Sequence, residues 1–108
     1  MVKYIEVITT FESADEAHEL ANKIVQQKLG ACGSISPIES IYRWKNKIET
    51  TQEFQLTIKT IESNYVELEN FILNNHSYET PQIISVPILG GSRDYLNWLN
   101  NETDEKIE

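Results

Sequence analysis

Hydrophobic and polar residues alternate along the chain with two different periods, which predict strands and helices in turn. Residues 3–10 are β-branched or aromatic at most positions, and this pattern predicts a short, largely buried strand. Between residues 14 and 29 apolar side chains recur at three- and four-residue steps, which predicts a helix. Ser13 and Glu16 fit a capping box at its start, with the Glu16 carboxylate returning to the Ser13 amide. Gly30 stands where a left-handed C-cap is expected.

The next pattern predicts a β-hairpin with two long strands. Residues 32–44 are extended, and Pro37 within them indicates either a bulge or an edge strand. Residues 45–47 form the turn, in which Asn46 best tolerates a positive φ. The second strand alternates most regularly, so that one face carries the apolar side chains Phe54, Leu56 and Ile58.

A second helix, a fourth strand and a third helix complete the pattern. Ser63 can cap the second helix, which ends at residues 74–76 and whose buried stripe comprises Tyr65, Leu68, Phe71 and Ile72. Residues 83–88 are predicted to form the fourth strand. After the glycine pair at 90–91, Ser92 is expected to cap a short helix that buries Tyr95, Leu96, Trp98 and Leu99.

The order strand, helix, strand, strand, helix, strand predicts an α+β, ferredoxin-like (split βαβ) fold with one antiparallel sheet. Right-handed crossovers place both helices on one face of that sheet. Depending on register, the other face exposes either Tyr42 and Trp44 or the row of Phe54, Leu56 and Ile58, and such a face is typical of an interface. We expect a single domain over residues 1–108, and a hairpin that reaches past it to pair with another subunit.

Charge and composition limit the classes of partner that the protein can bind. The 108 residues include 17 acidic and 9 basic side chains, and the resulting charge of -8 argues against nucleic-acid or anionic-membrane partners. A single cysteine, Cys32, excludes an internal disulfide. Residues 1–6 carry charges where a signal peptide would be apolar, so we expect a soluble, cytoplasmic protein. Residues 101–108 are expected to form an acidic tail.

Cys32 and His76 are the two candidate ligands for a soft or borderline metal ion. Each has a simpler explanation, because Cys32 can be a small buried hydrophobic residue and a cationic His76 would favour the dipole of the preceding helix. Neither Cys-x-x-Cys nor His-x-x-x-His supplies further ligands. A Cys–His nucleophile pair lacks identified oxyanion donors, and phosphate-binding and nucleophile-elbow motifs are absent. We therefore do not expect an enzyme.

Four segments of the chain, in the expected order and spacing, resemble those of the CutA divalent-cation tolerance family. They are Leu-Gly-Ala-Cys at 29–32, Ser-Ile-Tyr-Arg-Trp at 40–44 with the strand that follows, His-Ser-Tyr-Glu-Thr-Pro-Gln-Ile at 76–83, and Gly-Ser-Arg-Asp-Tyr-Leu-Asn-Trp-Leu at 91–99. The resemblance implies a homotrimer of ferredoxin-like subunits with PII-like architecture, in which the long hairpins pair between subunits. It also implies a role in the response to copper and other divalent metals, without an established enzyme reaction or a required cofactor.

The same resemblance implies an inter-subunit cleft lined by Cys32, Tyr42, Trp44, Glu53, Lys59, His76 and Tyr78. Within it Cys32 and His76 would bind a Cu or Zn ion. Thr9 and Asn75 stand where some family members have a further thiol or histidine, so the expected binding is weak.

Three functions stay open at this point. The first is metal tolerance by a homotrimer that binds Cu or Zn weakly between subunits. The second is a PII-like trimeric sensor that binds a small anionic metabolite through Lys59 and Arg43 and regulates a partner. The third is a purely structural trimer whose cleft residues are interface packing.

Overall fold

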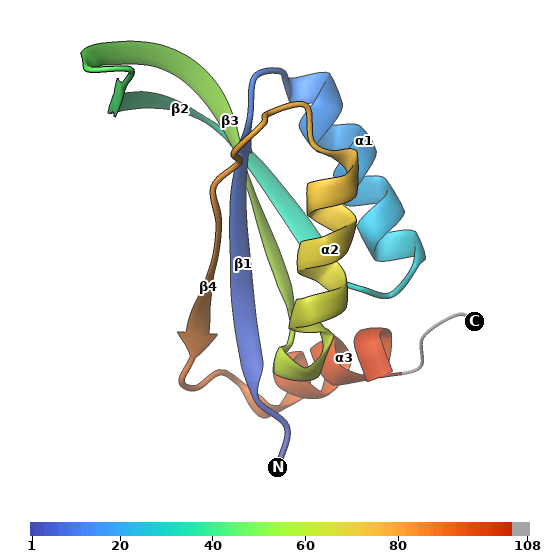
Figure 1. Cartoon of the computed structure of the whole chain (residues 1–108). Coiled ribbons are helices and arrows are strands. Elements are labelled where there is room, and N and C mark those ends of the chain that lie inside the picture. The colour runs from blue at the N-terminus through green and yellow to red at the C-terminus, as the bar shows by residue number, and fades with distance from the viewer. Residues whose placement is uncertain (105–108) are drawn as a thin grey trace.

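The computed structural model describes residues 1–104, which form a four-stranded antiparallel sheet and three α-helices (Figure 1). The strands lie in the order β2-β3-β1-β4. Along the chain the elements are β1 (Tyr4–Phe11), α1 (Ala14–Gln26), β2 (Cys32–Trp44), β3 (Lys47–Ile61), the 3₁₀ turn η1 (Glu62–Asn64), α2 (Tyr65–Asn75), β4 (Ile83–Ile88) and α3 (Arg93–Asp104). This order confirms the ferredoxin-like α+β fold, and β4 has the predicted bounds.

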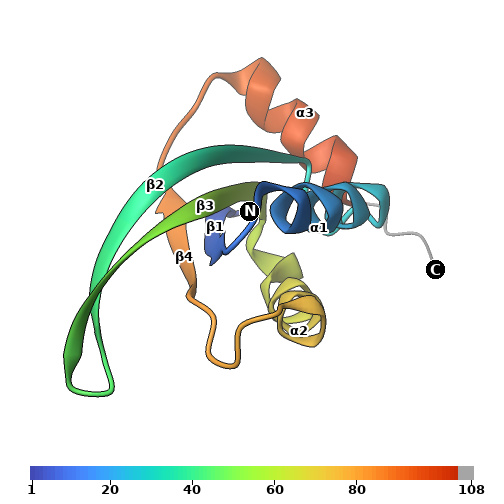
Figure 2. The same cartoon turned by 90° about the horizontal axis from the view of Figure 1, so that it is seen from above.

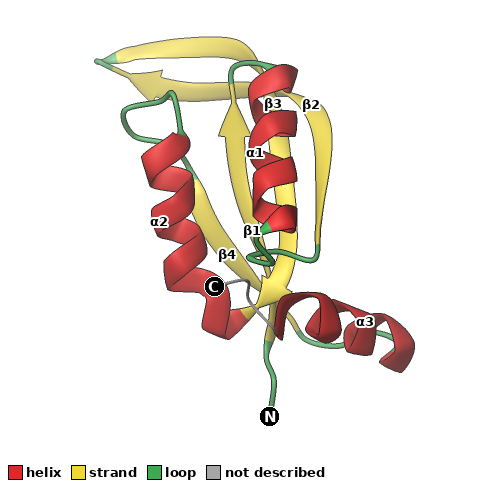
Figure 3. Ribbon diagram, turned by 90° about the vertical axis from the view of Figure 1, so that its right-hand side faces the viewer, coloured by secondary structure: helices red, strands yellow, loops and turns green. Residues whose placement is uncertain are grey.

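The core lies between the sheet and the helices α1 and α2, which cover the same face (Figure 3). Alternation along β3 points Leu56 and Ile58 into this layer, where both are fully buried. From the helices the core receives Leu20, Ile24, Leu68 and Ile72. The register is thereby resolved: the Phe54 row faces the helices, while Tyr42 and Trp44 lie on the open face and are 41% and 49% exposed.

Helix α1 begins as predicted but ends differently. The Ser13 side chain accepts a hydrogen bond from the Glu16 amide at 3.1 Å, which confirms the N-cap. The Glu16 carboxylate does not complete the capping box, because it accepts hydrogen bonds from Ser77 instead.

The predicted left-handed cap at Gly30 was wrong. The left-handed residue is Lys28, at φ 59°, and the Leu29 amide donates to the Ile24 carbonyl at 3.1 Å, as in a Schellman motif. Gly30 is needed for a different reason: a Cβ there would lie 2.5 Å from Cγ2 of Ile58. Close approach of the chain to β3, rather than backbone conformation, therefore requires glycine at this position.

The hairpin of β2 and β3 extends past the body of the domain (Figure 2), as predicted. Strand β1 pairs with β3 only as far as Phe54, so the distal part of β3 pairs with β2 alone. The tip is a two-residue turn at Lys45 and Asn46, with φ of 49° and 66°, as in a type I′ turn. Pro37 lies on the edge strand β2 in unbroken register, so the edge interpretation is confirmed and no bulge occurs there. Pairing of the hairpin with another subunit stays a prediction.

The second helix is not capped by Ser63. A 3₁₀ turn precedes α2, and Asn64 occupies the N-cap position without a side-chain capping bond. The Asn64 side chain is fully buried, and its Nδ2 donates to the carbonyl of Lys28 at 3.3 Å and to the hydroxyl of Thr60 at 3.2 Å. These bonds tie the end of β3 to the loop after α1. Because they hold Asn64 at the start of α2, the exposed Ser63 does not become the N-cap.

The third helix is longer than predicted. It runs to Asp104, so residues 101–104 are helical rather than a tail, and Thr103 is fully buried. Leu99 is buried as predicted and joins Ala31 and Ile61 in a second small core at the end of the sheet. Residues 105–108 of the predicted tail lie outside the described residues.

Two aromatic residues of α3 are more exposed than predicted. Tyr95 and Trp98 are 41% and 42% exposed in this chain, with their ring centroids 5.6 Å apart. Tyr95 lies one helical turn before Leu99 and therefore on the same side of α3, but only Leu99 of these three residues is fully buried in this chain. In the described part of the chain, none of the helices is long and apolar enough to cross a membrane.

Candidate functional site

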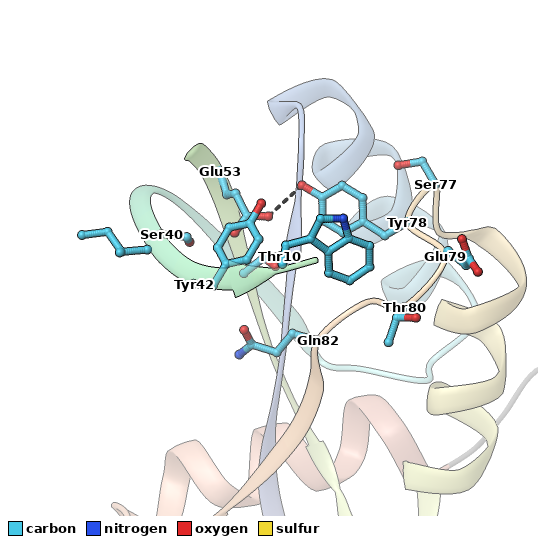
Figure 4. A pocket seen from close by; sticks show the side chains of 11 residues that line it. Thr10, Ser40, Tyr42, Glu53, Ser77, Tyr78, Glu79, Thr80 and Gln82 are labelled. Atoms are coloured by element: carbon cyan, nitrogen blue, oxygen red, sulfur yellow. Dashed lines mark hydrogen bonds between the residues drawn. The ribbon is translucent and has the colours of Figure 1, made fainter. Parts of the chain in front are cut away.

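A cavity of about 630 Å³ lies between the hairpin and the segment that follows α2 (Figure 4). The hairpin supplies one wall and residues 77–82 supply the other. The principal lining side chains are Thr10, Ser40, Tyr42, Trp44, Glu53, Tyr78, Glu79, Thr80 and Gln82. Four of the seven predicted cleft residues therefore meet here: Tyr42, Trp44, Glu53 and Tyr78.

Strand alternation brings the hairpin residues to this wall. Tyr42 and Trp44 are two positions apart on β2 and share a face, and the antiparallel register puts Glu53 of β3 on that same face. Figure 4 shows Tyr42 and Glu53 on the hairpin side, opposite Tyr78. The hairpin thus presents two aromatic rings and a carboxylate to one cavity.

Tyr78 and Glu53 form the direct contact across the cavity. The Tyr78 hydroxyl donates to Oε2 of Glu53 at 2.7 Å, and Glu53 is only 8% exposed. Burial raises the pKa of the Tyr78 phenol above its ordinary value, and the hydrogen bond to Glu53 and the charge of that carboxylate raise it further. The phenol therefore stays protonated and remains a hydrogen-bond donor.

His76 positions the start of residues 77–82. Its Nε2 lies 2.8 Å from the Thr10 carbonyl, and the backbone N–H of Tyr78 donates to its Nδ1 at 3.1 Å. A carbonyl can only accept and an amide N–H can only donate, so these contacts assign the neutral Nε2–H tautomer. The ring also stacks on Phe11, with centroids 4.3 Å apart and an interplanar angle of 9°.

The predicted cationic cap at His76 does not match this arrangement. Burial lowers the pKa of the imidazole, although the hydrogen bond to Thr10 and the charges of Glu16 and Glu53 act in the opposite direction. The two ring nitrogens also already have partners within the chain. A metal ion at His76 would have to replace one of these hydrogen bonds.

Ser77 fixes the same segment to helix α1. Its backbone N–H donates to Oε2 of Glu16 at 3.0 Å, and its hydroxyl donates to Oε1 at 2.9 Å. Neither residue was predicted to belong to the site. The relevant signal was Glu16 at the third position of α1, which fitted a local capping box as well as it fits this long-range contact.

The remaining predicted residues, Cys32 and Lys59, lie elsewhere on the sheet. They face each other across β2 and β3, and Nζ of Lys59 lies 3.8 Å from Oε2 of Glu6. The Cys32 thiol lies 3.7 Å from the hydroxyl of Tyr95. Burial raises the pKa of the Tyr95 phenol, as do its contact with Cys32 and the nearby charge of Glu6.

Cys32 and Lys59 lie toward one end of the sheet, and His76 lies toward the other. Lys59 pairs with Glu6, whereas His76 stacks on Phe11, five positions further along β1. At about 3.4 Å per residue this separation is roughly 17 Å. The structure therefore does not bring Cys32 and His76 together within one chain.

The donor set of residues 1–104 does not fit a metal ion. Within residues 1–104, no group of three or more His, Cys, Asp or Glu side chains is placed to hold one. The Glu6 carboxylate, whose charge acts on the Tyr95 phenol beside Cys32, is paired with Lys59. A Cu or Zn site with more ligands would need donors from beyond this part of the chain.

Comparison with known proteins identifies the relatives. A family model described as CutA1 divalent ion tolerance protein matches residues 5–102. The chain is 44% identical over 103 residues to the chloroplastic protein CutA of Arabidopsis thaliana, covering 94% of this chain and 57% of that protein. It is 35% identical over 102 residues to the divalent-cation tolerance protein CutA of Archaeoglobus fulgidus, covering 94% of this chain and 96% of that protein. Thus it spans less than two thirds of the plant relative but nearly all of the archaeal one.

Solved structures agree with the sequence comparison. CutA1 from Oryza sativa superposes with a TM-score of 0.92 at 42% identity, covering 94% of each chain. The periplasmic divalent cation tolerance protein CutA from Archaeoglobus fulgidus gives a TM-score of 0.91 at 33% identity, covering 93% of this chain and 98% of that chain. The resemblance first noted in four short segments is confirmed over most of the sequence, and the chain belongs to the CutA1 divalent ion tolerance family.

Proposed function

We propose that this protein is a homotrimer that contributes to tolerance of copper and other divalent cations, and that it acts by binding rather than as an enzyme. Membership of the CutA1 family over residues 5–102 is the observation that carries this proposal. A cytoplasmic location is part of the same proposal and rests on the sequence alone. The names of relatives include both chloroplastic and periplasmic proteins, so location varies within the family.

The open face of the sheet supports assembly. It carries Tyr42, Trp44, Ile84 and Val86, each between 38% and 49% exposed. Strands β2 and β4 are the two edges of the described sheet, and exposed edges of this kind are normally paired or protected. A second and third copy of the chain would cover this apolar face and these edges together.

Weak binding of Cu or Zn between subunits belongs to the proposal as well. Because residues 1–104 of one chain do not supply a fitting donor set, the predicted ligands Cys32 and His76 would have to come from different subunits. His76 would also have to exchange a hydrogen bond for the metal. Both requirements favour weak rather than tight binding.

Growth of a bacterial host that lacks its own CutA protein tests the tolerance function. Expression of this chain should restore growth in elevated copper. An equal amount of a variant that does not fold should not restore growth. If the folded protein is present and growth improves with neither copper nor any other divalent metal tested, the proposal is overturned.

Calorimetric titration of the reduced protein with Cu(I), Cu(II) and Zn(II) tests the metal site separately. Cys32→Ala should weaken metal binding. This variant should keep the fold around His76, because Cys32 is distant from the hydrogen bonds that hold the His76 ring. Binding that persists unchanged in both Cys32→Ala and His76→Ala would remove this site.

The anion-sensing alternative gains no comparable support. Lys59 is paired with Glu6, and Arg43 lies on the hairpin face opposite to Tyr42. The cavity is lined by the carboxylates of Glu53 and Glu79 instead. An anionic metabolite would be repelled by that lining, so metal tolerance is the function we retain.

A further inference from the structure

The cavity between the hairpin and residues 77–82 combines aromatic walls with negative charge. Tyr42, Trp44 and Tyr78 contribute rings, and Glu53 and Glu79 contribute carboxylates. Among its lining side chains in the described part of the chain, none is Lys, Arg or His. The lining is therefore anionic without an internal counter-charge.

The unbalanced negative charge of the cavity is centred on the side chain of Glu53. Its side chain is more than nine-tenths buried, and its hydrogen-bond partner within residues 1–104 is the neutral hydroxyl of Tyr78. The ion pairs of the same residues involve Lys23 and Lys59, neither of which contacts it. A buried carboxylate is costly unless a positive charge accompanies it, so the site is built to receive one.

The surrounding groups indicate which kind of cation fits. Aromatic faces attract ammonium and guanidinium groups, most strongly where water is excluded, whereas they offer no lone pairs to a metal ion. A volume of about 630 Å³ is that of a small-molecule site rather than of a bare ion. The net charge of -8 adds a general attraction for cations.

We propose that this cavity binds a small organic cation through an alkylammonium or guanidinium group. Glu53 would provide the counter-charge, and Tyr42 and Trp44 would provide the aromatic wall. This inference goes beyond metal tolerance and does not depend on it, because it uses none of the predicted metal ligands. A Lys or Arg side chain from a neighbouring copy offers the same chemistry, but the two walls already come from one chain and are joined by the Tyr78 hydrogen bond.

Fluorescence of Trp44 offers a direct measurement. The chain has two tryptophans, and Trp98→Phe leaves Trp44, on the cavity wall, as the single reporter. Titration of the assembled protein with choline should give a saturable change, with 3,3-dimethyl-1-butanol, its uncharged isostere, at least about tenfold weaker. In the converse variant, Trp44→Phe, the fluorescence of Trp98 should not respond.

Charge variants then test the counter-ion. Glu53→Gln keeps an acceptor for Tyr78 and should weaken choline binding at least about tenfold. Glu39→Gln removes the same charge from an exposed site on the hairpin, outside the cavity, and should leave binding unchanged. If Glu53→Gln fails to fold, Tyr42→Leu measured by calorimetry should show the loss instead, because Tyr42 lies outside the core of the chain. The mass of this variant in solution shows that its assembly is kept.

Three results would overturn the proposal. One is the absence of saturable choline binding up to about 10 mM, which is also the result expected if a neighbour's Lys or Arg already fills the cavity. Another is equal binding of choline and its uncharged isostere. The last is full binding by a folded Glu53→Gln variant.

Discussion

The hydroxyl of Tyr78 donates a 2.7 Å hydrogen bond to Glu53, the first residue of β3 beyond its pairing with β1. This contact ties the projecting hairpin back to the body of the domain. The donor is itself held in place, because the backbone N–H of Tyr78 donates to His76 and the His76 ring stacks on Phe11. A chain of contacts thus runs from the core to the hairpin and forms one wall of the cavity.

Removing the hydroxyl at this point should lower stability. We expect Tyr78→Phe to decrease the free energy of unfolding by about 1–3 kcal/mol, because the buried carboxylate of Glu53 loses its donor. Urea denaturation at fixed protein concentration measures the change. Tyr65→Phe is the matched control, since its hydroxyl bonds Glu69 within one helix at 2.9 Å and its loss should cost less. Equal losses in the two variants would show that the Tyr78 contact has no special role.

His76 should make stability depend on pH. Burial lowers the pKa of its imidazole below the ordinary value of 6.5, so the unfolded chain binds the proton more tightly than the folded protein does. The free energy of unfolding should therefore be fully retained above pH 6.5 and should decrease as the pH falls from there toward the lowered pKa.

Denaturation of three proteins at pH 8 and pH 5.5 isolates this contribution. His76→Gln should lose part of the decrease seen in the parent, because an amide does not titrate there. His18→Gln should keep the whole decrease, since His18 is exposed on α1. The same decrease in all three proteins would assign the pH dependence to other groups.

Gly30 should tolerate no side chain, although its backbone would allow one. In Gly30→Ala the new Cβ would lie 2.5 Å from Ile58 and 3.0 Å from Ile24, both fully buried. We expect a loss of about 1–3 kcal/mol in the free energy of unfolding, which thermal denaturation would detect. Gly90→Ala, with nothing within 4 Å of the added Cβ, should be close to neutral. A neutral Gly30→Ala would contradict the close packing of the loop on β3.

The sequence predicts the fold well because its strong signals are local and periodic. Alternation in β3 and the three- and four-residue steps of α1 each determine an element and its buried face without reference to distant residues. The errors occur where a distant contact overrides a local preference. Asn64 replaces Ser63 as the cap because its amide bonds two other parts of the chain, and Glu16 leaves its capping box for Ser77.

The candidate site was predictable only in part, for a related reason. Family resemblance names residues but gives no distances, so Cys32 and Lys59 were grouped with Tyr42 and Glu53. Within one chain the pairing of β1 with β3 keeps these residues apart, since it places Lys59 beside Glu6 and Phe54 beside Phe11. Their meeting between subunits stays a prediction. Pairing register depends on the whole sheet, and the spacing of residues in one strand does not reveal it.

The mass of the protein in solution tests most directly whether its open sheet face is completed by other copies of the chain. Size-exclusion chromatography with light scattering at micromolar concentration should give three times the chain mass of 12.5 kDa. A monodisperse, folded species of 12.5 kDa would contradict the account, because Tyr42, Trp44, Ile84 and Val86 would then remain exposed to water.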